Sequence, residues 1–331
     1  MTPVLDIEDL HITYRGSRGA IPAVRGVSLT LRPGETLGLA GESGCGKSTV
    51  AAAVLRLLPP GTEVTGRIGL GGEDVLTMGW GRLRAVRWAG AAIVFQGAMH
   101  SLNPVQRIVR QIAEPIVLHE GAERRAAEER AVQLMESVGL PAWRARSYPH
   151  ELSGGQRQRV MIAMALACSP ELIIADEATT ALDVMIQAQV LRLLKSLVAE
   201  RHIALVMISH DLSVLTDTCD RLAVMYAGRI VESGPAREVF DAGRHPYARG
   251  LAGAFPTVGD PAGRRRPRGL AGDPPDPTEL PGGCPFHPRC PVAMEACAVT
   301  DVALLPVRDG WSAACLRAAD ETAVAAEEGA R

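Results

Sequence analysis

The stretch that most constrains how this chain folds is rich in glycine and lies between an apolar run and a helical one. It reads LGLAGESGCGKSTVAAAVLRLL and has the P-loop spacing GxxxxGKS at Gly41, Gly46, Lys47 and Ser48. Glycines let the backbone curl so that its N–H groups point at phosphate, and the helix that follows adds a favourable dipole. The stretch predicts a strand, a phosphate-binding loop and a helix, with Lys47 on the β- and γ-phosphates and Ser48 on Mg2+.

The lysine of this loop is informative because the chain otherwise uses arginine. It has two lysines, Lys47 and Lys195, and thirty-three arginines. A compact ammonium is therefore favoured at position 47 over the broad guanidinium used elsewhere. This preference supports phosphate binding over a plain glycine-rich turn before a helix.

Apolar strand-like runs alternate with helical patterns up to about residue 240, which predicts an α/β domain over residues 1–240. Several runs are apolar throughout, as is typical of parallel strands buried on both faces. The clearest are TLGLA, AAIVF, ELIIAD, HIALVMIS and RLAVMYAG. Over about 97–165 the strand pattern fades and the amphipathic stretch AERRAAEERAVQLMESVGL appears, which predicts a helical insertion. Residues 241–331 shift to Pro and Gly and are expected to form a loop-rich extension.

Two carboxylates end the apolar run ELIIADE. Asp176 fits the role of holding Mg2+ through its water shell, and Glu177 then lies where a general base would meet a hydrolytic water. A separate stretch, LSGGQRQR, opens a helix with Ser153 as a good N-cap. Its two glycines leave bare N–H groups at a positive helix end, which predicts an anion site.

The chain shows no sign of a membrane-spanning or secreted protein. Its N-terminus MTPVLDIEDLHITY lacks a basic region followed by an apolar core, so no signal peptide is expected. The longest uncharged apolar run, VMIAMALACSP, is far short of the roughly 20 residues that span a bilayer. If the protein serves a membrane, another chain does the crossing. The formal net charge of -2 gives no global positive field to attract nucleic acid.

Five motifs together resemble the ATP-binding subunit of ABC transporters. GESGCGKST, LSGGQRQR, LIIADE, TALD and ISHD occur in that family's order and at its spacing. The resemblance implies the P-loop NTPase fold of ABC ATPases, with an N-terminal antiparallel β part, a helical insertion and a cysteine-containing C-terminal extension. It also implies an ATPase that uses ATP and Mg2+.

The resemblance also assigns roles to single residues. Tyr14 matches the aromatic residue that stacks on adenine, and Asp183 matches the loop that couples two ATP sites. Gln96 matches a glutamine that contacts Mg2+ and the attacking water, and His210 matches the histidine that reaches the γ-phosphate. The residues expected to bind ATP in the same chain are Tyr14, Gly41, Glu42, Ser43, Gly44, Cys45, Gly46, Lys47, Ser48 and Thr49.

The family's architecture implies a dimer in which each chain completes the other's site. The helix that LSGGQRQR opens would close on the nucleotide of the partner chain. The residues expected to serve the partner's ATP are Ser153, Gly154, Gly155 and Gln156. Binding of two ATP would close the dimer, and hydrolysis at Glu177 would reopen it.

Three stretches resemble the oligopeptide and dipeptide import group, some relatives of which carry nickel: SLNPVQRIVRQIAEPI, YPHELSGGQRQRVMIAMALACSPELIIADEATTALDV and HPYARGL. The FQxxxxSLNP form looks like the first of that group's two paired ATPase subunits. The resemblance implies a homologous second ATPase, two transmembrane permease subunits and an extracytoplasmic solute-binding protein as partners. It places the chain at the cytoplasmic face of the plasma membrane.

Four of the seven cysteines gather near the C-terminus, at Cys284, Cys290, Cys297 and Cys315. Four thiolates suit a structural zinc or an iron-sulfur cube, and four unligated buried thiols are the third possibility. The resemblance implies a 4Fe-4S cluster, because members with this C-terminal cysteine pattern carry one. Such a cluster would be structural or redox-sensing.

A function of another class stays open as the alternative. Soluble ABC ATPases act in nucleic-acid repair or translation, and some bind zinc or iron-sulfur clusters. Those proteins usually carry two ATPase cassettes in one chain or long coiled-coil insertions, whereas this sequence has one cassette and no heptad run. No nucleic-acid partner is therefore expected.

Overall fold

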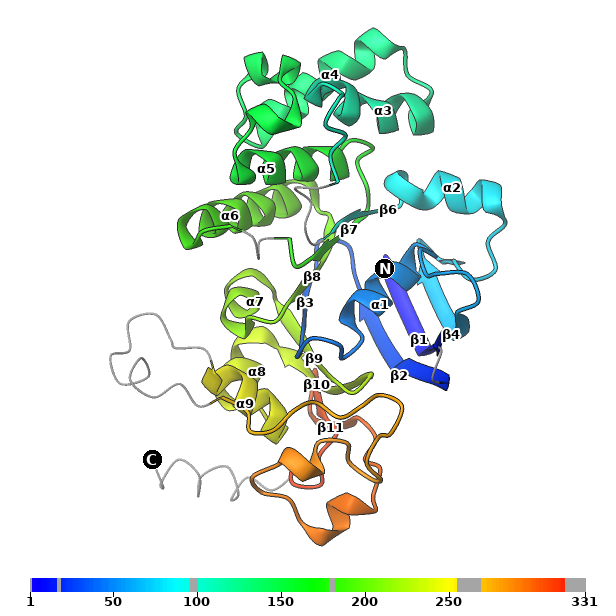
Figure 1. The fold of residues 1–331 in the computed structure, drawn as a ribbon, viewed down its shortest axis with the longest axis vertical. Helices are drawn as coiled ribbons and strands as arrows, with labels where there is room; N and C mark the ends of the chain where they lie inside the picture. Colours follow the sequence, from blue (N-terminus) through cyan, green and yellow to red (C-terminus); the bar gives the residue numbers. More distant parts are fainter. Residues whose placement is uncertain (1, 17–18, 96–100, 179–181, 255–268, 319–331) are drawn as a thin grey trace.

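The computed structural model describes residues 2–16, 19–95, 101–178, 182–254 and 269–318, which form two sheets flanked by helices (Figure 1). The smaller sheet is antiparallel, with strand order β2-β1-β4-β5. Its strands are β1 (Leu5–Gly16), β2 (Gly19–Leu31), β4 (Glu63–Leu70) and β5 (Glu73–Asp74). This sheet is the N-terminal antiparallel part that the motifs predict.

The larger sheet has the order β11-β12-β10-β9-β3-β8-β7-β6. Strands β9, β3, β8, β7 and β6 are parallel, and β10, β12 and β11 continue the sheet in antiparallel pairs. The strands are β3 (Thr36–Ala40), β6 (Ala91–Val94), β7 (Leu172–Asp176), β8 (Ala204–Ser209), β9 (Arg221–Tyr226), β10 (Arg229–Pro235), β11 (Leu305–Arg308) and β12 (Trp311–Ala313). The five parallel strands are the five apolar runs predicted from the sequence.

The continuous apolar character of the central strands follows from burial on both faces. In β7, Leu172 and Ile174 pack into one hydrophobic cluster, whereas Ile173 and Ala175 pack into the other. Successive side chains of a strand point to opposite faces, so both residue sets must be apolar when both faces are covered.

Helices cover the two faces unequally. The residues of α1 and α2 pack with the small sheet on one face, and those of α3 to α9 pack on the other. The helices are α1 (Lys47–Val54), α2 (Trp80–Ala89), α3 (Ile108–Glu120), α4 (Arg124–Ser137), α5 (Gly154–Ala165), α6 (Val184–Arg201), α7 (Leu212–Thr218), α8 (Ala236–Ala242) and α9 (Pro246–Ala254). Helices α3, α4 and α5 lie in the predicted insertion, at the top of Figure 1.

The C-terminal extension is joined to the central sheet. Strand β12 pairs with β10, and its Trp311 donates from Nε1 to Glu232 Oε1 at 2.7 Å. Glu232 is fully buried and also accepts the backbone N–H groups of Arg244 and His245, each at 2.7 Å. Burial raises the pKa of Glu232. Because these three donors come from two segments, residues 244–245 and β12, the carboxylate ties the extension to β10.

No helix in the described part of the chain is both long enough and apolar enough to cross a membrane.

Candidate active site

The P-loop connects β3 to α1 and encloses the side chain of Lys47. Gly46, at the N-cap of α1, has a φ of 105°, and a Cβ there would lie 2.3 Å from the carbonyl oxygen of Ala23. Only glycine therefore fits this position. Lys47 is buried, and its Nζ donates to the carbonyl oxygens of Gly41 at 2.7 Å and Glu42 at 2.8 Å. The loop thus holds a buried ammonium at its centre.

The magnesium ligands expected from the sequence lie close to this ammonium. Asp176 ends β7 and is 5% exposed. Burial raises the pKa of Asp176, whereas a hydrogen bond from Ser48 and the charge of Lys47 lower it. Within the described residues, Asp176 Oδ1 is buried and has no hydrogen-bond partner. A carboxylate oxygen without a partner beside a serine hydroxyl fits Mg2+, which prefers oxygen ligands.

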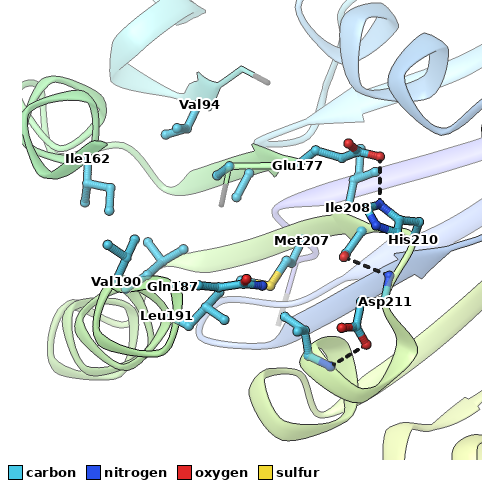
Figure 2. Close-up of a pocket in the computed structure, with 15 residues that line it drawn as sticks. Val94, Ile162, Glu177, Gln187, Val190, Leu191, Met207, Ile208, His210 and Asp211 are labelled. Carbon is cyan, nitrogen blue, oxygen red and sulfur yellow. Dashed lines mark hydrogen bonds and ion pairs between the residues drawn. The ribbon is translucent and has the colours of Figure 1, made fainter. Parts of the chain in front are cut away.

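Glu177 and His210 face one cavity from the ends of neighbouring strands. Figure 2 shows Glu177 after β7 and His210 after β8, with Glu177 Oε1 3.4 Å from His210 Nδ1. Their side chains help to line a cavity of about 140 Å³. Glu177 has a φ of 45°, which is rare for a residue with a Cβ, and its N–H donates to Ile208 O at 3.0 Å. The strained turn aims a carboxylate at the cavity, where it can accept a proton.

Tyr14 lies beside the helix that follows the P-loop. It belongs to β1, and its hydroxyl donates to Thr49 Oγ1 of α1 at 3.1 Å. The two positions are 35 residues apart in the sequence. The fold therefore brings the predicted adenine-stacking residue next to the predicted phosphate site.

The LSGGQ residues begin α5 with a reciprocal capping box. Ser153 Oγ accepts the N–H of Gln156 at 3.3 Å, and Gln156 Oε1 accepts the N–H of Ser153 at 3.1 Å. A Cβ at Gly155 would lie 2.5 Å from Ile186 Cγ2, so glycine allows α5 to pack closely on α6. Figure 1 shows α5 beside α3 and α4, away from α1. Within one chain, these residues are not brought to Lys47.

The sequence predicts two further site residues, Asp183 and Gln96, and the structure describes the first of them. Asp183 is exposed and caps α6, where its Oδ1 accepts the N–H of Ile186 at 3.0 Å. Gln96 lies outside the described residues.

Comparisons with known proteins agree with this geometry. The family model described as ABC transporter matches residues 24–180. The oligopeptide transport ATP-binding protein OppD of Salmonella typhimurium is 46% identical over 296 residues, which cover 89% of this chain and 88% of that protein. The chain belongs to the ABC transporter family. The OppD of Escherichia coli is 45% identical to this ABC ATPase, with the same coverage of the two chains.

The C-terminal part and the fold have matches of their own. A second family model, described as Oligopeptide/dipeptide transporter, C-terminal region, matches residues 231–297. The solved dimeric structure of MJ0796, a bacterial ABC transporter cassette, superposes with a TM-score of 0.63 at 28% identity, covering 70% of this chain and 99% of that one. CbiO1 from Clostridium perfringens superposes with a TM-score of 0.62 at 27% identity, covering 72% and 91%. The predicted ABC ATPase fold is confirmed.

The four C-terminal cysteines of this ABC ATPase line one cavity together with His245 and Phe286. All four are half-buried and in no disulfide. Burial raises the pKa of Cys284, Cys290 and Cys315, and neighbouring thiols of the group raise it further. In the described ranges, no group of three or more His, Cys, Asp or Glu residues is arranged to hold a metal ion. The positions of these thiols in the described residues therefore support neither a zinc site nor the expected 4Fe-4S cluster.

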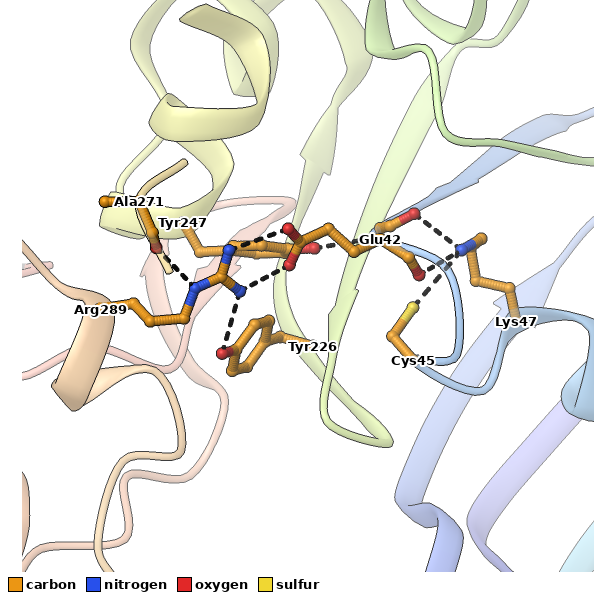
Figure 3. A network of polar contacts seen from close by, with 8 residues as sticks. Glu42, Cys45, Lys47, Tyr226, Tyr247, Ala271 and Arg289 are labelled. Atoms are coloured by element: carbon orange, nitrogen blue, oxygen red, sulfur yellow. Dashed lines mark hydrogen bonds and ion pairs between the residues drawn. The ribbon is translucent and has the colours of Figure 1, made fainter. Parts of the chain in front are cut away.

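Sequence reasoning missed the contacts that the C-terminal extension makes with the P-loop. Arg289 and Tyr247 both bind Glu42, the second residue of the loop (Figure 3). Tyr247 belongs to the HPYARGL stretch, which marks the import group, and Arg289 directly precedes Cys290. Neither residue carries a local signal of contact with a loop about 200 residues or more away.

Proposed function

We propose that this ABC ATPase is the ATP-hydrolysing motor subunit of an importer for di- or oligopeptides. One observation carries the proposal: a full set of ATP-site residues is followed in the same chain by the C-terminal region of oligopeptide and dipeptide transporters. The curated relatives named for oligopeptide transport match nearly the whole chain. The alternative role in nucleic-acid repair or translation has no comparable support.

Hydrolysis is proposed to use residues at the ends of β3, β7 and β8. Lys47 neutralises the β- and γ-phosphates, while Ser48, Asp176 and Gln96 hold Mg2+, which supplies charge neutralisation when bound. Glu177 takes the proton of the attacking water, and His210 reaches the γ-phosphate. The strained turn at Glu177 and its closeness to His210 support this division of roles.

Closure is proposed to join two chains. The N-terminus of α5, with Ser153, Gly154, Gly155 and Gln156, meets the ATP of the partner chain, and Asp183 lies near the joint between the two sites. Phosphate charge favours a helix N-terminus, so ATP stabilises the closed dimer more than the open one. The position of α5 away from α1 in one chain supports this arrangement. The partner is a homologous second ATPase.

The remaining partners and the location follow from the same proposal. Two permease subunits provide the membrane crossing, and an extracytoplasmic binding protein delivers the peptide. The chain then lies at the cytoplasmic face of the plasma membrane. The proposed domains are a nucleotide-binding domain over residues 1–240, with the insertion at about 97–165, and a C-terminal extension over residues 241–331.

A 4Fe-4S cluster is proposed at Cys284, Cys290, Cys297 and Cys315. Four thiols around one cavity are the donor set of such a cluster. When bound, the cluster would cross-link loops that have few regular elements of their own and would offer one-electron chemistry.

Co-purification tests the proposed function. A tagged chain is expressed together with the other components of the proposed importer. It is expected to retain two permeases and a second ATPase. Peptide-loaded binding protein should stimulate the ATP hydrolysis of this complex. Retention of nucleic acid or ribosomes instead, with hydrolysis stimulated by nucleic acid, would favour the alternative. Hydrolysis that responds to neither would contradict the importer.

A further inference from the structure

The P-loop contains a carboxylate that no phosphate-binding role explains. Glu42 follows Gly41 in the loop, and its backbone carbonyl oxygen accepts Lys47 Nζ at 2.8 Å. The position of Glu42 therefore helps to set the position of the ammonium that binds phosphate. Whatever fixes Glu42 also shapes the loop.

Arg289 of the C-terminal extension fixes the side chain of Glu42. Its Nη1 donates to Glu42 Oε2 at 2.7 Å and its Nη2 donates to Oε1 at 2.9 Å, so the pair is bidentate (Figure 3). The side chain of Arg289 is 6% exposed and that of Glu42 is 24% exposed. Water therefore screens this pair less than an ordinary surface ion pair.

The guanidinium is itself held from two other sides. Nε donates to the carbonyl oxygen of Ala271 at 2.9 Å, and Nη1 also donates to the hydroxyl of Tyr226 at 3.3 Å. The hydrogen bond with Glu42 raises the pKa of Arg289. A lysine could not make this planar set of bonds, because it carries a single nitrogen.

The backbone of Glu42 is bound by the extension as well. Its N–H donates to the hydroxyl of Tyr247 at 2.8 Å. Tyr247 is fully buried and packs against Tyr226 and Phe286, with ring centroids 4.6 and 5.3 Å away. A packed aromatic cluster of Tyr226, Tyr247 and Phe286 thus lies between the P-loop and the segment that carries the four C-terminal cysteines.

We propose that Arg289 is a positioning residue for the P-loop, so that the C-terminal extension forms part of the ATP site. It acts through Glu42, whose carbonyl oxygen holds Lys47, and touches no phosphate itself. The inference rests on the proposed ATP site and is independent of the solute that is transported. Loss of Arg289 leaves the Glu42 carboxylate half-desolvated without its cation, and the loop is then expected to shift.

The test is a comparison of steady-state ATP hydrolysis in the full chain with its partners. Arg289→Ala is expected to raise the KM for Mg-ATP about tenfold while kcat at saturation changes less than twofold. Arg289→Lys keeps the positive charge but loses the bidentate contact with the Glu42 carboxylate, so KM should rise about threefold. Glu42→Gln combined with Arg289→Ala should raise KM no further than Arg289→Ala alone, because both changes remove one contact.

A matched control separates positioning from general loosening of the extension. Arg229 and Asp301 form another ion pair between β10 and the extension, with side chains 33% and 53% exposed. Arg229→Ala is expected to leave KM unchanged. An equal rise of KM in this control would overturn the inference, as would an unchanged KM in folded Arg289→Ala.

Two further readouts keep the test decisive. If Arg289→Ala does not fold, Arg289→Lys carries the test, and a wild-type KM in that variant would overturn the inference. The rate of ATP hydrolysis by the wild-type protein tests the proposed function. The ratio of the KM of the Arg289 variant to the KM of the wild type tests the role of Arg289. The two claims therefore fail separately.

Discussion

At the scale of single residues, two side chains are held in unusual states. Glu177 has a left-handed backbone and a carboxylate beside His210, and His245 is an almost fully buried imidazole. Strain and burial both cost stability, so they persist where the surrounding structure compensates. Each state leads to a measurable expectation.

Replacing the carboxylate of Glu177 should stop hydrolysis without preventing ATP binding. Glu177→Gln keeps the shape of the side chain but cannot accept a proton from water, so kcat should fall about 100-fold or more. Phosphate release and binding of a fluorescent ATP analogue measure the two properties. Glu171→Gln, an exposed carboxylate just before the other end of β7, is the control and should keep kcat. Normal kcat in Glu177→Gln would rule out the general base.

His245 should make stability depend on pH. Burial lowers the pKa of His245 from 6.5 to about 3, and the charge of Arg249 adds to this effect. Between these values the unfolded chain binds a proton that the folded chain excludes. The free energy of unfolding therefore falls as pH drops below about 6.5, by up to about 1.4 kcal/mol per pH unit from this group.

His245→Asn tests this dependence. His245 Nδ1 accepts the N–H of Tyr247 at 3.1 Å, and the asparagine oxygen can replace that acceptor without titrating. Urea unfolding at pH 7 and pH 5 should show a smaller loss of stability in the variant than in the wild type. The same loss in both proteins would show that His245 is not responsible.

At the scale of elements, a side-chain hydrogen bond from Trp311 to a buried carboxylate adds to the strand pairing that joins β12 to β10. Trp311→Phe removes the Nε1 donor of Glu232 and should lower the free energy of unfolding by about 1.5–3 kcal/mol, because a buried charged acceptor loses a partner. Chemical denaturation measures the loss. Trp143→Phe, at a site 65% exposed, should change stability little. Equal effects of the two substitutions would contradict the anchoring role.

The cysteine segment gives a second expectation at this scale. Anaerobically purified protein should contain about four iron and four sulfide per chain, with broad absorption in the visible range. Cys290→Ser should lower both contents, whereas Cys168→Ser, at a buried thiol in the turn after α5, should not. Zinc alone, or no metal in the wild type, would contradict the proposed cluster.

Local sequence patterns predicted most of the strands and helices. They did not predict the contacts between residues that lie far apart in the sequence. The apolar runs of β3, β7 and β8 were recognisable because both faces of these strands are buried. Strands β11 and β12 were not predicted, because they are short and their pairing depends on β10. The motifs named Lys47 and Asp176, whereas the pair of Arg289 and Glu42 joins residues 247 positions apart and has no local signature.

At the scale of the whole molecule, one chain carries two separated parts of ATP chemistry. The ends of β3, β7 and β8 carry the first part, with Lys47, Asp176, Glu177 and His210 at or just after them. Helix α5 lies apart from these strand ends, among the helices of the insertion (Figure 1). This separation supports a motor that works as a dimer. The C-terminal extension contacts the P-loop through Arg289 and the larger sheet through Trp311.

The most direct measurement is ATP-driven uptake of a labelled oligopeptide by vesicles that contain the complete complex and its binding protein. Accumulation inside the vesicles is expected with the wild-type chain and is expected to disappear with Glu177→Gln, at equal amounts of assembled complex. The Glu171→Gln complex should accumulate peptide as the wild type does. Hydrolysis of ATP without accumulation of any di- or oligopeptide, or accumulation that persists in Glu177→Gln, would contradict the account.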